Sequence, residues 1–195
     1  GTDSPTGGAV RHFALRVTDV DALIARVREA GYAVKLLGFV KKDEDSITPI
    51  VAPFLVPRTN ILSGVNDVFN GISVVGNMVG ETMFYGHGAG SAPTASAIVG
   101  DIIEACEVHS SPVLWEENAP EGYVKDASLC AFARYLRVKG TRADSLTNLA
   151  ECAVKAVSHG DETGFFLPPM TEEELSLILR AAPELKVVSS LRIYG

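Results

Sequence analysis

The fold of this chain is decided by residues 84–101, FYGHGAGSAPTASAIVGD. A strand-like run ends in three glycines within five residues, and Pro93 then opens a helix rich in small residues. Glycine accepts positive φ and lets another molecule approach the backbone closely. The start of the following helix offers unpaired N–H groups and a partial positive charge, which suit an anion. A plain strand–turn–helix corner is the alternative, because a short glycine-rich turn alone is a weak signal.

Composition places the chain among ordinary globular proteins. Hydrophobic residues make up 47% and charged residues 21% of its 195 residues, which disfavours a disordered chain. The net charge of −7 would repel phosphates, so nucleic acid is not an expected partner. No apolar run reaches the roughly 20 residues that span a bilayer, and residues 1–8 lack the basic region of a signal peptide. Three widely spaced cysteines, Cys106, Cys130 and Cys152, predict buried free thiols, no zinc site and a cytoplasmic location.

The first hundred residues predict strands interrupted by two helices. The expected elements are a strand at 10–17, a helix at 18–30, strands at 33–40 and 47–56, strands at 71–75 and 78–85, and a helix at 94–105. Thr18 or Asp19 can cap the first helix, and Gly31 ends it. Both strand pairs favour antiparallel hairpins, the second with a tight turn at Gly76-Asn77. The apolar side chains of the second helix are expected to face a partner layer.

The last third of the chain predicts a separate module. Residues 109–127 hold two prolines and no clear period, which is typical of a linker. After it come a strand at 131–139, a helix to about 154, strands at 157–159 and 164–167, a helix capped by Thr171, and a strand at 186–194. This βαββαβ order is the ferredoxin-like arrangement. The expected fold is therefore α/β (α+β): a mixed or antiparallel sheet with helices on one face in residues 1–108, the linker 109–127, and a ferredoxin-like module in 128–195.

Several of these stretches together resemble homoserine dehydrogenase. The matching residues are, in order, 31–37 (GYAVKLL), Pro57, 63–71 (SGVNDVFNG), 85–90 (YGHGAG) and 93–101 (PTASAIVGD). The resemblance covers residues 31–101 well and 132–195 moderately. The final module is similar to the ACT domain that many of these enzymes carry at their C-terminus. The glycine–Pro-Thr-Ala motif is specific because Val-Asn-Asp-Val-Phe-Asn precedes it.

The resemblance implies an oxidoreductase function. Such enzymes interconvert L-homoserine and L-aspartate 4-semialdehyde with NAD(P), in threonine, methionine and isoleucine biosynthesis, with amino-acid feedback through the ACT domain. The glycine turn would lie beside the NAD(P) site, so the resemblance assigns cofactor contact first to Gly88 and then to Gly86, Ala89 and Gly90. The helix after the turn would pack against the nucleotide-binding domain.

Parts of that family's machinery do not occur in these residues. No strand followed by a GxGxxG loop precedes Gly88. The family's catalytic lysine and its homoserine-binding acids belong to a segment upstream of the match, so no catalytic residue is assigned. Lys35 lies in a later element and is expected to be a strand residue with its ammonium in solvent. We therefore expect this chain alone to bind no NAD(P) firmly and to be inactive.

The ACT-like module suggests an effector site. The loop at 140–145 follows its first strand, where such domains commonly bind amino acids. Asp144 and Asn148 could hold the ammonium or carboxylate of an amino acid such as threonine by charge-assisted bonds. The usual Asp-x-Pro-Gly turn is absent, and helix capping by Asp144 is the alternative. Exposed sheet edges and ACT pairing predict a homodimer.

Other interpretations stay open at this point. Residues 11–32 also resemble the opening βα unit of a glyoxalase-type (vicinal oxygen chelate) domain, in which His12 would bind a divalent metal for a lyase. No further ligands follow, so no metal site is expected. His87 could be an acid–base group or a solvent-facing turn histidine. Asn66 and Asn70 could lie near a dimer sheet or an active-site cleft, or bond within turns. A non-enzymatic, ACT-type amino-acid-sensing or dimerisation module is the alternative function.

Overall fold

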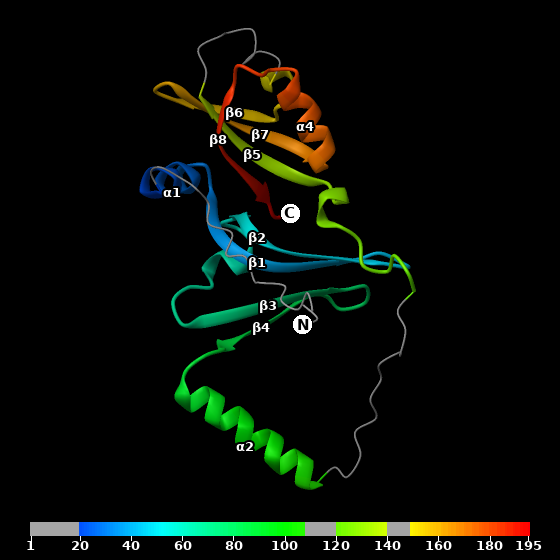
Figure 1. Ribbon diagram of the computed structural model, residues 1–195. Helices are drawn as coiled ribbons and strands as arrows, with labels where there is room; N and C mark the ends of the chain where they lie inside the picture. Colours follow the sequence, from blue (N-terminus) through cyan, green and yellow to red (C-terminus); the bar gives the residue numbers. More distant parts are fainter. Residues whose placement is uncertain (1–19, 108–119, 140–148) are drawn as a thin grey trace, which may run out of the picture.

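The computed structural model describes residues 20–107, 120–139 and 149–195. Its described strands form a six-stranded sheet in the order β1-β2-β8-β5-β7-β6 and a separate sheet of β3 and β4 (Figure 1). The strands are β1 (Tyr32–Lys42), β2 (Ile47–Pro57), β3 (Phe69–Gly76), β4 (Gly80–His87), β5 (Phe132–Lys139), β6 (Lys155–His159), β7 (Glu162–Met170) and β8 (Lys186–Ile193). The helices are α1 (Val20–Glu29), α2 (Ser91–Glu107) and α4 (Glu172–Arg180), with 3₁₀ turns η1 (Ile61–Gly64) and η2 (Ala127–Leu129).

Both expected hairpins are confirmed. Strands β1 and β2 pair antiparallel along their whole length, and the acidic turn between them is exposed. Strands β3 and β4 also pair antiparallel, but Gly76 opposes Gly80. The connection is therefore residues 77–79 and not the Gly76-Asn77 dipeptide. The positive φ that closes it, +77°, falls on Gly80, because glycine adopts this conformation without steric cost.

The final module has the expected order of elements. Its four strands are adjacent as β8-β5-β7-β6 and pair antiparallel, which is the ferredoxin-like order. Residues 149–152 are helical. Helix α4 begins with a capping box, in which the Thr171 hydroxyl accepts from the Glu174 N–H at 3.3 Å and the Glu174 carboxylate accepts from the Thr171 N–H at 2.7 Å.

One pairing joins the module to the first hairpin. Strand β2 runs parallel to β8, with Phe54 opposite Arg192 and Leu55 opposite Ile193. The Tyr194 N–H then donates to the Leu55 carbonyl at 2.8 Å. Strands that precede and strands that follow the expected linker at 109–127 thus belong to one hydrogen-bonded sheet. The domain division at that linker stays a prediction.

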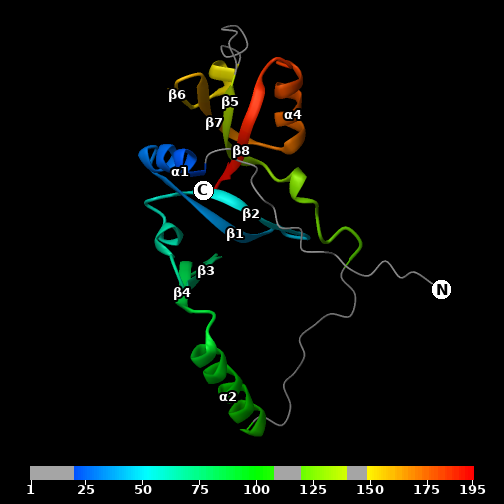
Figure 2. The same cartoon turned by 60° about the vertical axis from the view of Figure 1, so that its left-hand side comes forward.

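Helices cover the two faces of the module's sheet. Tyr135 and Leu136 are neighbours on β5 and point to opposite faces. Tyr135 packs in a core with Leu23 and Val27 of α1, whereas Leu136 packs in a core with Leu175 of α4. Side chains this deeply buried contribute about 1.5–3 kcal/mol each through removal from water. Helix α2 stands apart from both cores (Figures 1 and 2).

The face under α1 depends on a glycine in β7. A Cβ on Gly164 would lie 2.6 Å from Cε2 of the Tyr135 ring, which is itself buried. We predict that Gly164→Val displaces this ring and lowers the free energy of unfolding by about 1–3 kcal/mol. Gly38→Val is the matched control, because Gly38 lies in β1 with nothing within 4 Å of such a Cβ. Urea unfolding followed by circular dichroism compares the two variants; equal losses would contradict the prediction.

Candidate functional site

The glycine turn lies at the junction of β4 and α2. Strand β4 ends at His87 and α2 begins at Ser91, three residues earlier than expected at 94. The Thr94 N–H donates to the Gly90 carbonyl at 3.1 Å and closes the first turn of the helix. That first turn holds no acidic side chain. The partial positive charge of the helix start is therefore not offset locally and favours an anionic group.

The three glycines of this turn have different physical roles. Gly90 has a φ of +117°, which other residues rarely adopt. A Cβ on Gly88 would lie 2.6 Å from the Asn70 Cγ, so packing by Asn70 accounts for this glycine. A Cβ on Gly86 would meet nothing within 4 Å. The space beside Gly86 is therefore open to another molecule, whereas internal structure explains Gly88 and Gly90.

Aromatic side chains lie on the face of the hairpin next to the turn. The Phe69 ring stacks on Tyr85 with centroids 4.9 Å apart and contacts the His87 ring at 4.4 Å. His87 is exposed and makes no hydrogen bond or ion pair within the described part of the chain. This environment matches the solvent-facing alternative for His87 better than an acid–base role, which would need an orienting partner.

Lys35 does not extend freely into solvent, so that expectation is wrong. Its Nζ donates to Asn66 Oδ1 at 2.8 Å and to the Val65 carbonyl. Asn66 in turn donates through Nδ2 to the Gly64 carbonyl at 3.1 Å. Asn66 thus makes the turn hydrogen bonds that were its alternative role, and Lys35 ties β1 to the segment that leads into β3.

This lysine borders a cleft of about 470 Å³. The cleft lies between α1, β1 and η1, and three basic residues line it: Arg28, Lys35 and Arg58. The three share no motif, and sequence reasoning considered only Lys35, as a strand residue, so it did not predict this cleft. Their positive charges would favour an anion in this cleft.

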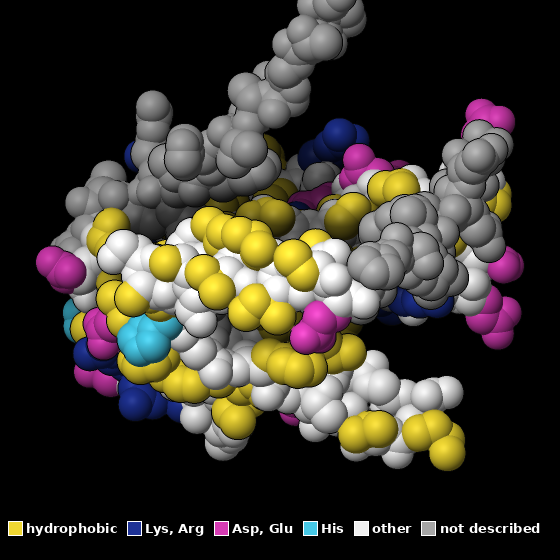
Figure 3. All heavy atoms as spheres, turned by 90° about the horizontal axis from the view of Figure 1, so that it is seen from below, with side chains coloured by type: hydrophobic (Ala, Val, Ile, Leu, Met, Phe, Trp, Pro, Cys, Tyr) yellow, Lys and Arg dark blue, Asp and Glu magenta, His cyan; other side chains and the backbone are white. Residues whose placement is uncertain are grey.

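Helix α2 exposes an apolar face. Ile98, Val99, Ile102 and Ile103 are between 53% and 57% exposed, and no residue of the helix is buried. Strands β3 and β4 add Ile72, Val74 and Phe84 on the face opposite the aromatic cluster, also exposed. Figure 3 shows hydrophobic side chains spread over this side of the molecule. Contiguous exposed apolar surface of this kind marks a site of contact with other protein.

Several expected site residues lie outside the described residues. They are Asp144 and Asn148 of the effector loop and His12 of the metal alternative. Within the described ranges no group of three or more His, Cys, Asp and Glu side chains could hold a metal ion. No described helix is long and apolar enough to cross a membrane.

The cysteines are all free, as expected, but they are not all buried. Cys106 and Cys152 are exposed, and Cys130 is half-buried. The expectation of buried thiols is therefore wrong for the first two. Cys106 lies on the unpacked helix α2, and Cys152 ends the helical residues 149–152, where the outer face meets solvent.

Comparisons with known proteins agree on one family. The family described as homoserine dehydrogenase matches residues 8–103. Homoserine dehydrogenase of Helicobacter pylori is 35% identical over 176 residues, 84% of this chain and 42% of that protein. The enzyme of Bacillus subtilis is 29% identical over 196 residues, 91% of this chain and 45% of that protein. The chain thus spans less than half the length of these relatives.

Solved structures give the same result for the fold. A homoserine dehydrogenase from Thiobacillus denitrificans superposes with a TM-score of 0.71 at 26% identity, covering 88% of this chain and 44% of that one. The family match begins at residue 8, so it includes the whole segment 11–32 that also resembled a glyoxalase-type domain. That segment contains α1 and ends at the first residue of β1, and these two elements pack together in one core.

Proposed function

Because the chain belongs to the homoserine dehydrogenase family through residues 8–103, we propose that it forms part of an enzyme that interconverts L-homoserine and L-aspartate 4-semialdehyde with NAD(P). The observation that carries the proposal is the turn between β4 and α2. It combines an unblocked backbone at Gly86 with a helix start that no local carboxylate neutralises. Both features suit a phosphate-bearing cofactor.

The glycines of the turn are proposed cofactor contacts in a revised order. Gly86 comes first, because its backbone is the one that another molecule can approach without displacing a side chain. Gly88, Ala89 and Gly90 follow, contributing through the conformation of the turn. NAD(P) would supply the hydride chemistry when bound. The role of this chain's residues would be to position one side of the cofactor.

The exposed face of α2 fits the same proposal. Its isoleucine and valine side chains would be covered by a nucleotide-binding domain, for which these 195 residues contain no GxGxxG fingerprint. The family's catalytic groups have no counterpart assigned here. We therefore propose that a polypeptide of these 195 residues alone does not catalyse the reaction and holds NADP weakly.

The final module would serve regulation and assembly. Its ferredoxin-like strand order and separate core around Leu136 support an ACT-type domain in residues 128–195. Asp144 and Asn148 would contact an amino-acid effector such as threonine, and the module would pair with a second copy in a homodimer. The same observation supports the alternative function, a non-enzymatic amino-acid-sensing or dimerisation module. The free thiols support a reducing, cytoplasmic location.

Hydride transfer from L-homoserine to NADP, followed by NADPH absorbance, tests the proposal. The chain alone is compared with a chimera in which the part of the Helicobacter pylori enzyme that precedes its match is fused to this chain. We expect turnover by the chimera and none by the chain alone. Turnover by the chain alone would contradict the proposal that these 195 residues do not catalyse the reaction by themselves. A folded but inactive chimera would favour the non-enzymatic alternative.

The chimera also tests the turn itself. Gly86→Val fills the open space beside the backbone, so we expect KM for NADP to rise roughly tenfold with little change in kcat. Gly38→Val in β1 makes the same substitution in a strand with equal free space and should leave KM unchanged. An unchanged KM in Gly86→Val would show that the cofactor does not approach this backbone.

A further inference from the structure

The cleft between α1, β1 and η1 carries an excess of positive charge. Arg28, Lys35 and Arg58 line it, and no described acidic side chain does. The whole chain has a net charge of −7, so the sign of this local charge is opposite to that of the molecule. Salt screens exposed charges from one another beyond about 8 Å, so the nearby groups decide which ligand the cleft attracts. The cleft therefore favours an anion.

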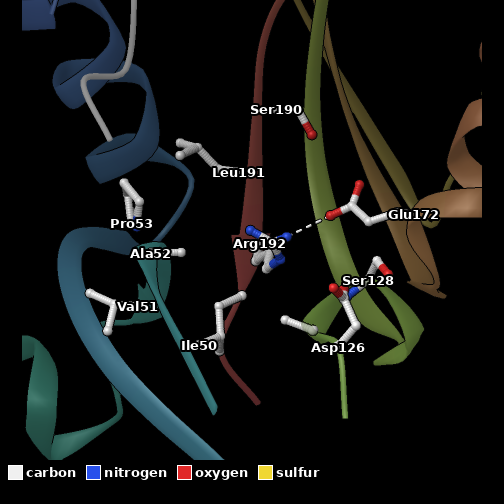
Figure 4. Close-up of a pocket in the computed structure, with 11 residues that line it drawn as sticks. Ile50, Val51, Ala52, Pro53, Asp126, Ser128, Glu172, Ser190, Leu191 and Arg192 are labelled. Carbon is white, nitrogen blue, oxygen red and sulfur yellow. Dashed lines mark hydrogen bonds and ion pairs between the residues drawn. The ribbon is translucent and has the colours of Figure 1, made fainter. Parts of the chain in front are cut away.

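The two arginines of this cleft have no carboxylate partner among the described residues. The described arginines that bind a glutamate are Arg26, Arg134, Arg137 and Arg192. Figure 4 shows one of these pairs, Arg192 with Glu172, in the cleft between β2, β8, η2 and the start of α4. The described arginines that form no ion pair with a described residue are Arg28, Arg58 and Arg180. Two of these three line the same cleft, so the positive charge gathered there is available to a ligand.

Lys35 adds a positive charge that is held in position. Its Nζ donates to the Val65 carbonyl and to Asn66 Oδ1, and both of these acceptors are uncharged. The two hydrogen bonds therefore orient the ammonium without neutralising it. An ammonium has three N–H donors, so one donor is left for a ligand in the cleft.

Hydrogen bonds connect the elements that carry these cations. The Arg58 N–H donates to the carbonyl of Gly31, just after α1, at 2.9 Å. The Arg58 carbonyl accepts from the Ser63 hydroxyl of η1 at 3.2 Å. Gly31 has a φ of +93°, which lets the chain turn from α1 into β1 beside Arg58. The backbone that carries the cations is thus in place before a ligand arrives, which lowers the cost of binding.

The charges and the size of the cleft indicate the chemistry of the ligand. Arg28 lies in the last turn of α1, where it offsets part of the negative end of the helix dipole. Lys35 and Arg58 still supply about two positive charges at neutral pH, which match a dianion better than a single carboxylate. A guanidinium binds two phosphate oxygens at once. The volume of about 470 Å³ exceeds that of a phosphate group, and the half-buried Ile24 and Tyr32 add apolar surface.

We propose that this cleft binds a phosphate monoester dianion with a small apolar organic group. Lys35 and Arg58 bind the phosphate oxygens, Arg28 is a weaker third contact, and the organic group lies against Ile24 and Tyr32. The cleft shares no described residue with the turn at 86–90, and the proposal does not rest on the proposed enzyme function. Because the site joins α1, β1 and η1, its ligand would stabilise the folded chain.

Titration of the 195-residue chain, followed by backbone amide NMR in low-salt buffer at about pH 8, where a phosphate monoester is a dianion, tests the site. Phenyl phosphate is the main probe, benzenesulfonate has a similar shape but one negative charge, and inorganic phosphate lacks the ring. We expect phenyl phosphate to bind with a dissociation constant in the millimolar range or below. Benzenesulfonate should bind roughly tenfold more weakly, and inorganic phosphate several-fold more weakly.

The position of the amide shifts decides where the probe binds. They should centre on Gly31, Arg58 and Ser63, which surround the cleft. Absence of phenyl phosphate binding by the folded chain would overturn the proposal, and so would equal affinity for benzenesulfonate. Shifts confined to the turn at 86–91 would also overturn it, because the anion would then bind at the start of α2.

Two matched variants connect binding to the cleft. Arg58→Gln removes one positive charge and should weaken phenyl phosphate binding roughly tenfold. Its thermal stability should not change, because the Arg58 side chain is exposed and forms no ion pair with a described residue. Arg180→Gln is the control, since Arg180 is also exposed and unpaired within the described residues but lies on α4, outside the cleft. It should bind as the original chain does; equal losses in the two variants would reflect net charge alone and overturn the proposal.

Discussion

Replacing Phe54 by alanine is expected to lower the free energy of unfolding by about 3–5 kcal/mol, a large part of the stability of a typical domain. Phe54 is fully buried in β2. Its ring centroid lies 5.5 Å from that of Phe132, the first residue of β5, and 6.2 Å from that of Phe39 in β1. The Tyr194 ring, just after β8, contacts Phe39 at 6.2 Å. Removing Phe54 therefore leaves a cavity at the centre of an aromatic cluster that joins the first hairpin to the final module.

This cluster is important for holding the hairpin and the module together, because the strand pairing between β2 and β8 is short. Strands β2 and β8 pair at two positions, so side-chain packing supplies most of the contact between the hairpin and the module. We expect urea unfolding of the original chain to show one transition in circular dichroism, shifted as a whole by Phe54→Ala. Hydrogen exchange should show that β2 and β5 lose protection together.

Phe84→Ala provides the matched control for this prediction. Phe84 lies on the open face of β4 and is 68% exposed, so the same change should alter stability by only about 0.5 kcal/mol or less. Two separate transitions, of which Phe54→Ala moves only one, would show that the hairpin and the module unfold independently.

Local sequence patterns predicted the elements, the two hairpins and the order of the final module, but not how the first hairpin joins that module. Each hairpin follows from alternating apolar residues and a nearby turn, because both signals act over a few residues. The cap at Thr171 likewise follows from the acidic residues after it. The parallel pairing of β2 with β8 left no local signal, since it joins segments from opposite ends of the chain. The aromatic cluster around Phe54 forms only once that pairing exists.

The candidate site shows the same limit of sequence reasoning. The turn at residues 86–90 was located from its glycines, yet the order of their importance depends on where Asn70 packs. That contact arises from the pairing of β3 with β4, which places Asn70 opposite Gly86 and next to Gly88. The cleft lined by Arg28, Lys35 and Arg58 was not predicted either, because α1, β1 and η1 come together there only in the folded chain.

Glu162 forms ion pairs with arginine side chains of α1 and β5 on the face of the sheet that α1 covers. Its Oε2 accepts from Arg26 of α1 at 2.7 Å and lies 2.9 Å from Nε of Arg137, while Oε1 accepts from Arg137 Nη2 at 3.3 Å. Arg137 is 3% exposed, and Glu162 is 16% exposed. Glu162→Gln keeps the shape but leaves the buried Arg137 without a counter-ion. We expect a loss of about 3 kcal/mol at neutral pH, near the lower end for breaking a buried pair.

This loss should depend on pH in a defined direction. The hydrogen bond from Arg26, together with those from Arg137, holds the pKa of Glu162 below its ordinary value, although burial opposes them. The unfolded chain therefore takes up the proton first as pH falls. The stabilisation is complete above the unfolded pKa of about 4.3, and it decreases as pH falls through the lower folded value. The difference in stability between the original chain and Glu162→Gln should shrink over this acidic window.

Urea unfolding between neutral pH and about pH 3 measures this difference, with the window set by carboxyl pKa values. Glu184→Gln is the control, since Glu184 is exposed and makes no ion pair within the described residues. It should match the original chain at every pH. If the curves for Glu162→Gln and the original chain stayed parallel, the charge of Glu162 would not be what holds α1 and Arg137 in place. The packing of Leu23 and Val27 alone would then account for the position of α1.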